Sequence, residues 1–273
     1  MDYVTSRDGT TLAWTRSGNG PPLVLSPGLT GHHKVWDPLL PALEPRFSVV
    51  TFDRRGRGDS GDARPEAFEV AREAEDIVVL LTALDEPAHL LGHSSGGINA
   101  LEAALLLDSE RLRTLLLYEP PFRVERDRLP SDLYERVTAL NDAGDREGVV
   151  ELFLREEIAM TPEQIDEIRA TPVWERRVAI AHIVAREIRG VLDYIFKPAR
   201  FAHLRTPTLL ILGGDSPPQF RPTIAALHAA LPDSRVVVMP GQQHNALVTG
   251  PEQLAEVMLE FLLPLTAPPA IPP

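Results

Sequence analysis

The chain has 273 residues and a mass of 30.1 kDa, a length that fits one large α/β domain or one domain with an insertion. It has no cysteine, which excludes disulfides, cysteine-ligated zinc, iron–sulfur clusters and a thiol nucleophile. The 39 acidic residues outnumber the 27 basic ones, giving a formal charge of −12. This balance argues against nucleic acid as a partner, because phosphate binding needs clustered positive charge.

Targeting signals are absent from the sequence as it stands. The first twenty residues carry charges at Asp2, Arg7 and Asp8 and contain no apolar run of the signal-peptide kind. The longest apolar runs, such as Leu209–Leu212, are far shorter than the roughly 20 residues that a membrane helix needs. These features predict a cytoplasmic protein with no membrane partner. The oligomeric state stays open, a homodimer included.

Short apolar runs alternate with longer helical patterns along the chain. Strands are predicted at Thr11–Ser17, Pro22–Ser26, Phe47–Asp53, His89–Gly92, Arg113–Tyr118, Thr208–Leu212 and Arg235–Met239. Helices are predicted at Phe68–Leu84 and from Ser94 to Leu107. This alternation indicates βαβ units, and the nearly continuous apolar character of the strands fits a mostly parallel sheet covered on both faces.

The segment from Pro121 to Pro198 shows no strand pattern. Its predicted helices are Leu133–Leu140, Val149–Met160, Pro162–Arg169 and Val173–Ile188. We interpret residues 121–198 as a helical lid over the carboxyl edge of the sheet, where open α/β sheets place ligands. Residues 1–120 and 199–263 then form the core. The proline-rich residues 264–273 are expected to be a loose tail that cannot continue a helix.

A Gly-x-Ser-x-Gly pattern at residues 92–96 follows a predicted strand directly and precedes a predicted helix directly. A sharp turn at this position strains the central residue and presents its side chain at the helix N-terminus, where free N–H groups favour negative charge. The pattern therefore predicts that Ser94 is a nucleophile. The alternative is a glycine-rich turn with an incidental serine.

A catalytic serine needs a base and donors for the oxyanion. His244 follows the last predicted strand, where the chain order serine, acid, histidine places the base. One oxyanion donor is expected to be the backbone N–H of Ser95 at the start of the helix. The second is expected from Gly28 or Leu29, in the loop after the first buried strand.

Two further histidines are candidates for the substrate pocket. His32 follows the loop after the first buried strand, and His93 precedes the nucleophile. A metal site made of His32, His33 and His93 is disfavoured, because no carboxylate falls at ligand spacing. We expect no metal and no cofactor.

These motifs together resemble the α/β-hydrolase fold family over about residues 4–263. Residues 53–60 read Asp-Arg-Arg-Gly-Arg-Gly-Asp-Ser, which is similar to the Asp-x-Arg-Gly-x-Gly-x-Ser loop common in that family. We interpret this loop as a structural turn beside the site, shaped by Asp53 and the glycines. The resemblance implies the α/β-hydrolase fold, with a mostly parallel central sheet flanked by helices and an inserted helical lid.

The acid of the expected triad departs from the commonest pattern of the family, Gly-x-x-Asp-Pro after the strand that follows the lid. Residues 213–217 read Gly-Gly-Asp-Ser-Pro, so Ser216 occupies the acid position and Asp215 lies one residue early. A subset of the family instead carries the acid after the strand that precedes the lid, where this chain has Glu119. We therefore predict that Glu119 is the acid and keep Asp215 as the alternative.

That subset includes the zearalenone lactonases, which the chain resembles in short segments. Their Cys-Ser-Ser-Gly is similar to residues 93–96, and their Glu-Leu-Pro is similar to residues 119–121. Their histidine follows Pro-Gly-Met, similar to residues 240–243 with one residue inserted. Their lid carries Pro-Val-Trp, whose tryptophan packs on the aromatic substrate, similar to residues 172–174. The resemblance suggests that Trp174 faces the pocket; the alternative is a residue of the lid core.

These observations predict a serine hydrolase whose partner is a small-molecule carboxylic ester or lactone, an aromatic macrolactone such as zearalenone included. Dehalogenases and epoxide hydrolases are disfavoured, because they carry a carboxylate at the position of Ser94. A thioesterase, an amidase or a carbon–carbon bond hydrolase would use the same triad. A non-catalytic binding relative would retain it, because fold alone does not decide function.

Overall fold

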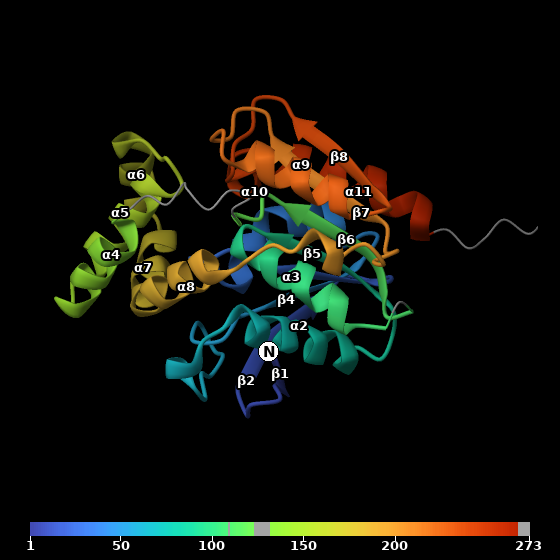
Figure 1. The fold of residues 1–273 in the computed structure, drawn as a ribbon, viewed down its shortest axis with the longest axis horizontal. Coiled ribbons are helices and arrows are strands. Elements are labelled where there is room, and N and C mark those ends of the chain that lie inside the picture. Colours follow the sequence, from blue (N-terminus) through green and yellow to red (C-terminus); the bar gives the residue numbers. More distant parts are fainter. Residues whose placement is uncertain (109, 123–131, 267–273) are drawn as a thin grey trace, which may run out of the picture.

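A computed structural model of the chain describes residues 1–108, 110–122 and 132–266, and a central sheet organises them (Figure 1). The strands of the sheet are β1 (Asp2–Thr5), β2 (Thr11–Ser17), β3 (Pro22–Ser26), β4 (Ser48–Phe52), β5 (Ala88–His93), β6 (Leu112–Tyr118), β7 (Thr208–Gly213) and β8 (Ser234–Met239). Their order across the sheet is β1-β2-β4-β3-β5-β6-β7-β8. Every strand that the sequence predicts is present within about a residue of its expected limits.

The strands from β3 to β8 pair in parallel, whereas β1 and β2 pair antiparallel at one edge. The prediction of a mostly parallel sheet in an α/β-hydrolase fold is confirmed. β1 was not predicted from the sequence. It is a short edge strand whose residues are mostly exposed, so it carries no apolar run.

Helices cover both faces of the sheet. One face carries α2 (Val70–Ala83), α3 (Ser95–Leu106) and α9 (Phe220–Ala230), and the other carries η1 (His33–Leu39), α1 (Leu40–Leu43), α10 (Ala246–Thr249) and α11 (Pro251–Thr266). Side chains of β6 alternate between the two cores, with Leu115 and Leu117 on the first face and Leu116 and Tyr118 on the second. Burial on both faces explains why the strands read as continuous apolar runs.

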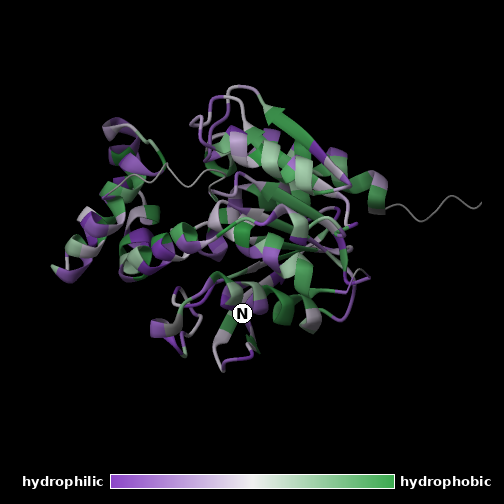
Figure 2. Cartoon of the chain, viewed as in Figure 1, coloured by the Kyte–Doolittle hydropathy of each residue, from purple (hydrophilic) through white to green (hydrophobic). Residues whose placement is uncertain are grey.

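The helices between β6 and β7 form a cluster beside the sheet, which we name the helical block (Figure 1). It comprises α4 (Leu133–Asp142), α5 (Arg146–Glu156), α6 (Pro162–Arg169), α7 (Pro172–Ala179) and α8 (Ala181–Asp193). Hydrophilic and hydrophobic residues mix along these helices, and the apolar ones form a core of their own (Figure 2). The described residues of this segment contain no strand, as predicted.

Three details of the predicted helices and tail are wrong. The helix predicted at Val149–Met160 begins and ends earlier, as α5. Val173–Ile188 is not one helix, because the backbone leaves the helical region at Ile180 (φ −101°, ψ 7°) and divides it into α7 and α8. The expected tail begins too early, because α11 continues through Pro264 to residue 266. The proline removes one N–H near the helix end, while burial of Phe261 and Leu262 holds the preceding turn on the core. The rest of the predicted tail, 267–273, lies outside the described residues.

Short 3-10 helices complete the connections, η2 (Pro65–Ala67) before α2 and η3 (Pro198–Arg200) before β7. None of the helices in the described ranges combines the length and the apolar character that crossing a membrane requires.

Candidate active site

The predicted site residues follow the carboxyl ends of parallel strands. Ser94 follows β5, Glu119 follows β6 and His244 follows β8. His93 pairs with Tyr118 at the ends of β5 and β6, so Ser94 and Glu119 leave neighbouring strands at the same level. The topology therefore brings together side chains that lie far apart in the sequence, at the edge where open α/β sheets place their ligands.

Ser94 occupies a strained turn between β5 and α3. Its backbone has φ 53° and ψ −130°, a conformation that residues with a side chain rarely adopt. The Ser94 N–H donates to the Tyr118 carbonyl at 2.9 Å, and the Gly97 N–H donates to the Ser94 carbonyl at 2.7 Å. A Cβ on Gly96 would lie 2.5 Å from the Pro27 carbonyl oxygen, so this turn needs glycine there. The geometry is that of a nucleophile elbow.

A buried carboxylate contacts the histidine. Glu119 Oε2 lies 2.7 Å from His244 Nδ1, and Glu119 Oε1 accepts the Gly213 N–H at 2.7 Å. Glu119 is fully buried, and it has a positive φ of 47°. Asp215 is exposed instead, and no hydrogen bond joins its carboxylate to His244. Of the two predicted acids, the structure brings Glu119 to the histidine.

The His244 ring contacts two other rings. Phe220 stacks on it at 4.5 Å with an interplanar angle of 10°, and the His93 ring lies 4.7 Å away. His93 Nε2 lies 2.8 Å from the His244 carbonyl oxygen. Burial, with His244 nearby, lowers the pKa of His93 well below its usual value. His93 is therefore neutral at physiological pH and can donate this hydrogen bond, which fixes the backbone that carries the candidate base.

Tyr118 holds the same loop from the other side. Its hydroxyl donates to the Gln243 carbonyl and accepts the Ala246 N–H at 3.2 Å. Burial and the neighbouring charge of Glu119 raise the pKa of Tyr118, so the hydroxyl keeps its proton. The residue just before the candidate acid thus positions the loop of the candidate base.

The loop after β3 approaches the nucleophile closely. A Cβ on Gly28 would lie 3.0 Å from Ser94 Cβ. Arg57 Nη1 donates to the carbonyls of Gly28 at 3.3 Å and Leu29 at 2.6 Å. Because a peptide is planar and trans, the Leu29 N–H points opposite to the Gly28 carbonyl and away from Arg57. The Ser95 N–H, in the first helical position of α3, has no acceptor within its own helix.

Buried ion pairs support this loop, and the sequence analysis did not find them. Arg54 Nε lies 2.6 Å from Glu73 Oε2, and Arg54 Nη2 lies 2.9 Å from Glu187 Oε2. Arg57 also pairs with Glu187, which belongs to α8 of the helical block. The available signal was the three arginines after β4, but Glu187 lies 130 residues from Arg57, beyond any local pattern. The 53–60 loop thus contacts both the helical block and the loop after β3, which we name the Gly28 loop.

His32, His33 and Asp53 come close enough to share a metal ion, with their candidate ligand atoms within 4.8 Å of one another. The sequence analysis disfavoured a site of His32, His33 and His93 because no carboxylate falls at ligand spacing, and it missed Asp53. Asp53 follows β4, which pairs with β3, so it lies beside the two histidines that follow β3. Asp53 Oδ1 already accepts from His33, and Oδ2 accepts the Asp59 N–H at 3.0 Å. These bonds fit the structural turn inferred from the sequence.

Two cavities of about 40 Å³ each open at Ser94, one toward the Gly28 loop and one toward the helical block. Both are lined by Ser94 and Phe153. The first is also lined by residues of the β3 and β8 loops and of the block, namely Gly28, Leu29, Thr30, Gly31, Val35, His93, Ile158, Met160, Arg177, His244, Asn245 and Leu247. The second is lined by Pro121, Leu133, Tyr134, Glu157, Ile188, Val191 and Leu192.

The structure places two predicted substrate contacts outside these cavities. His32 lines neither of them. Trp174 is buried in the core of the helical block, where the Arg169 guanidinium lies 4.2 Å from its ring centroid. The prediction that Trp174 faces the substrate is not supported, and the alternative of a lid-core residue fits its surroundings. His93 does line the first cavity, as predicted.

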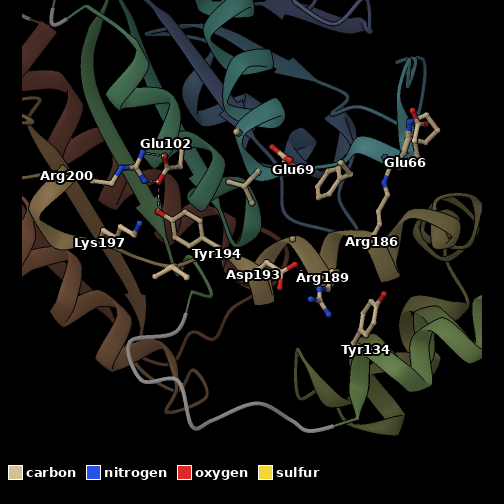
Figure 3. Close-up of a pocket in the computed structure, with 16 residues that line it drawn as sticks. Glu66, Glu69, Glu102, Tyr134, Arg186, Arg189, Asp193, Tyr194, Lys197 and Arg200 are labelled. Atoms are coloured by element: carbon tan, nitrogen blue, oxygen red, sulfur yellow. Dashed lines mark hydrogen bonds and ion pairs between the residues drawn. The ribbon is translucent and has the colours of Figure 1, made fainter.

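A larger cavity of about 760 Å³ lies between α2 and α8, away from the candidate triad. Figure 3 shows its charged lining, in which Glu102 binds both Arg200 and Tyr194. Neither Ser94, Glu119 nor His244 lines it. The larger cavity is therefore not the candidate active site, which lies at the two small cavities beside Ser94.

The elbow, the buried histidine–carboxylate pair and the sheet order define one class of protein. Residues 23–257 match the Alpha/beta hydrolase family, and the chain belongs to this family. An α/β hydrolase of known structure from Sphaerobacter thermophilus is 35% identical, with a TM-score of 0.83, over 96% of this chain and 100% of that one.

Two named relatives match nearly the whole chain. The pimeloyl-[acyl-carrier protein] methyl ester esterase of Aeromonas hydrophila is 29% identical over 251 residues, which cover 90% of this chain and 97% of the relative. The 2-(acetamidomethylene)succinate hydrolase of Mesorhizobium japonicum is 27% identical over 259 residues, covering 92% and 91%. The relatives therefore place the chain among hydrolases and leave its substrate open.

Proposed function

We propose that the chain is a serine hydrolase that cleaves a small carboxylic ester or lactone through an acyl-enzyme on Ser94. The 2.7 Å contact between His244 and Glu119, beside a serine at a strained elbow, carries this proposal. The methyl ester esterase among the relatives supports ester chemistry.

His244 acts as the general base. Its Nδ1 faces the carboxylate of Glu119, so the neutral ring carries its proton there and leaves Nε2 as the acceptor. Nε2 takes the proton of Ser94 as the hydroxyl oxygen attacks the substrate carbonyl. Glu119 holds the ring in this tautomer and stabilises the imidazolium that forms. His244 then gives the proton to the leaving alcohol and later activates the water that releases the acid.

The N–H groups of Ser95 and Leu29 bind the oxyanion. Ser95 directly follows the elbow. Leu29 lies on the loop after β3, which approaches Ser94 closely at Gly28. Preorganised donors of this kind stabilise the negative charge that develops in the transition state. In a lactone the leaving alcohol stays joined to the acyl group, so the product is one ring-opened molecule.

The helical block acts as a lid. Phe153 lines both cavities at Ser94, and Ile188 lines the second, so the block closes the site over the nucleophile. Cavities of about 40 Å³ each are small beside the ~300–1,000 Å³ of typical drug-sized sites. A short ester or lactone needs less widening of these cavities than an aromatic macrolactone such as zearalenone.

The test compares Ser94→Ala with Ser234→Ala, the same chemical change on the distant strand β8. With 4-nitrophenyl butanoate as substrate, Ser94→Ala should lower kcat by at least ~10³-fold. Ser234→Ala should keep the wild-type rate. A fluorophosphonate probe should label the wild type and Ser234→Ala but not Ser94→Ala.

Full activity in Ser94→Ala would end the proposal. Folded wild type that neither hydrolyses the ester nor reacts with the fluorophosphonate would favour a non-catalytic binding protein instead. Zearalenone, supplied to the same enzymes, should remain intact, and a Ser94-dependent ring-opened product would show that the lid opens far wider than this structure.

A further inference from the structure

Arg177 differs from the other deeply buried arginines of the described chain. Arg54, Arg55 and Arg57 each pair with at least one buried carboxylate within hydrogen-bond distance. Arg177 is only 9% exposed, yet no carboxylate of the described residues lies within ion-pair distance of it. A buried cation without a counter-ion is costly, so its position needs a reason.

The surroundings of Arg177 account for only part of its hydrogen-bonding capacity. Nη1 donates to the Thr30 hydroxyl at 3.2 Å, and this is its single hydrogen bond to the described residues. A guanidinium has five N–H donors in a planar fork, so most of them remain for another acceptor. Burial lowers the pKa of Arg177 to about 10, which leaves the group positively charged at neutral pH.

Arg177 also lines the first cavity at Ser94, together with His244 and the Gly28 loop. It reaches the site from α7 of the helical block, next to the loop that is expected to supply an oxyanion donor. The nearest ionisable groups of the cavity, His93 and His244, carry no negative charge. Of the described residues that line this first cavity, Arg177 is the only one with a permanent charge. Glu157 lines the second cavity, and Glu119 lies behind His244 on the side of Nδ1.

We infer that Arg177 binds a carboxylate of the substrate, so that the preferred substrates are short esters or lactones that carry a second, free carboxylate. The planar fork matches a carboxylate in two parallel hydrogen bonds, and the low-polarity surroundings of Phe153, Ile158 and Met160 strengthen the attraction. This inference rests on the proposed function, since it names the substrate class of the same site. The succinate skeleton in the name of one relative's substrate is consistent with it.

The first experiment compares charged and neutral esters. One pair is monomethyl succinate and dimethyl succinate, with the charge on the acyl side. The other is acetoxyacetate and its methyl ester, with the charge on the alcohol side. In the wild type, kcat/KM should favour the anionic member of at least one pair by roughly 10- to 100-fold, as for a hydrogen bond between charged groups.

Two variants isolate the role of Arg177. Arg177→Met should bring the ratio of anionic to neutral kcat/KM close to one, whereas Arg177→Lys should retain part of the preference. Arg176→Met is the matched control, because it removes the same charge from the same helix at a residue outside both cavities. It should keep the wild-type ratio.

A measurement without turnover separates this inference from the proposed function. Ser94→Ala should bind monomethyl succinate in a calorimeter, and Ser94→Ala/Arg177→Met should bind it at least tenfold more weakly. Arg177→Met alone should melt no lower than the wild type, because the variant removes a buried charge without a counter-ion.

The outcomes are distinct. Ser94-dependent hydrolysis with no preference for charge in either pair would overturn the inference and leave the proposed function standing. Equal losses of kcat/KM for anionic and neutral esters in Arg177→Met would also overturn it. Such losses would mean that Arg177 only positions the Gly28 loop through Thr30. Arg177-dependent binding without any hydrolysis would support the carboxylate site and end the proposed function.

Discussion

His244 Nδ1 and Glu119 Oε2 lie 2.7 Å apart, although 125 residues separate the two in the chain. The contact joins the end of β6 to the loop after β8, across β7, whose terminal Gly213 donates its N–H to the same carboxylate. Glu119 thus makes the contact with His244 Nδ1 that an acid after β7 would otherwise have to make. Asp215, at the end of β7, points to solvent.

Glu119→Gln should lower kcat by roughly 10³- to 10⁴-fold with little change in fold, because the side chains have nearly the same shape. The amide would present an N–H group to His244 Nδ1 and force the ring into the wrong tautomer. Asp215→Asn is the control and should keep kcat within about twofold, as is usual for an exposed substitution. The measurement is steady-state hydrolysis of 4-nitrophenyl butanoate, and the reverse ranking of the two variants would move the acid to Asp215.

Gly96→Ala should slow the enzyme through the loop after β3. A Cβ at Gly96 would lie 2.5 Å from the carbonyl oxygens of both Ser26 and Pro27, so the chain that leads to Gly28 must shift. We expect kcat to fall by about 10²-fold or more, the usual cost of a lost oxyanion donor. Gly61→Ala is the matched control, since its Cβ would meet nothing closer than 3.6 Å. Equal rates in the two variants would contradict the tight approach of this loop to the elbow.

Glu187→Gln should destabilise the protein strongly. Glu187 is buried and shared by Arg54 and Arg57, so its loss leaves two buried cations with less compensation. The free energy of unfolding should fall by about 3 kcal/mol or more, as when one partner of a buried ion pair is removed. Asp193→Asn breaks the exposed pair with Arg189 on the same helix and should change stability little.

Urea unfolding measures the free energy of unfolding of both variants. The rate of hydrolysis at low urea, where the variants are still folded, gives a second readout. Arg57 donates to the carbonyls of the Gly28 loop and depends on Glu187 for its position, so loss of Glu187 should also lower this rate. If Glu187→Gln were as stable and as active as Asp193→Asn, the ion pairs would not support the oxyanion loop.

The local features of this protein could be predicted from its sequence. Apolar runs mark β3 to β8, and the Gly-x-Ser-x-Gly pattern marks the elbow, because each depends on residues adjacent in the chain. The choice of Glu119 over Asp215 came from the register of two short motifs, 119–121 and 213–217. The geometry agrees with that choice, since Glu119 Oε2 lies 2.7 Å from His244 Nδ1.

Other contacts between distant segments, which no motif marks, could not be predicted. Arg177 reads in the sequence as one charge of the polar α7, and only the fold shows that it lines the cavity of Ser94. Glu187 is also indistinguishable from a surface glutamate until α8 packs on the 53–60 loop. Trp174 matched a lactonase motif, yet the packing of α6 and α7 buries it in the block. In each case three-dimensional packing, not residue type, decides the role.

Buried His89 should make stability depend on pH. Burial, with a smaller effect of Arg113, lowers the pKa of His89 to about 4, whereas an unfolded chain has the ordinary value of 6.5. Between these values the unfolded state binds a proton that the folded state does not, so stability is lost as pH falls below about 6.5. One such group contributes a slope of up to about 1.4 kcal/mol per pH unit. His89→Asn should flatten the urea-derived stability profile between pH 4.5 and 6.5 by about this amount. His203→Asn, at an exposed position, should keep the wild-type slope, and parallel profiles for the wild type and His89→Asn would refute the prediction.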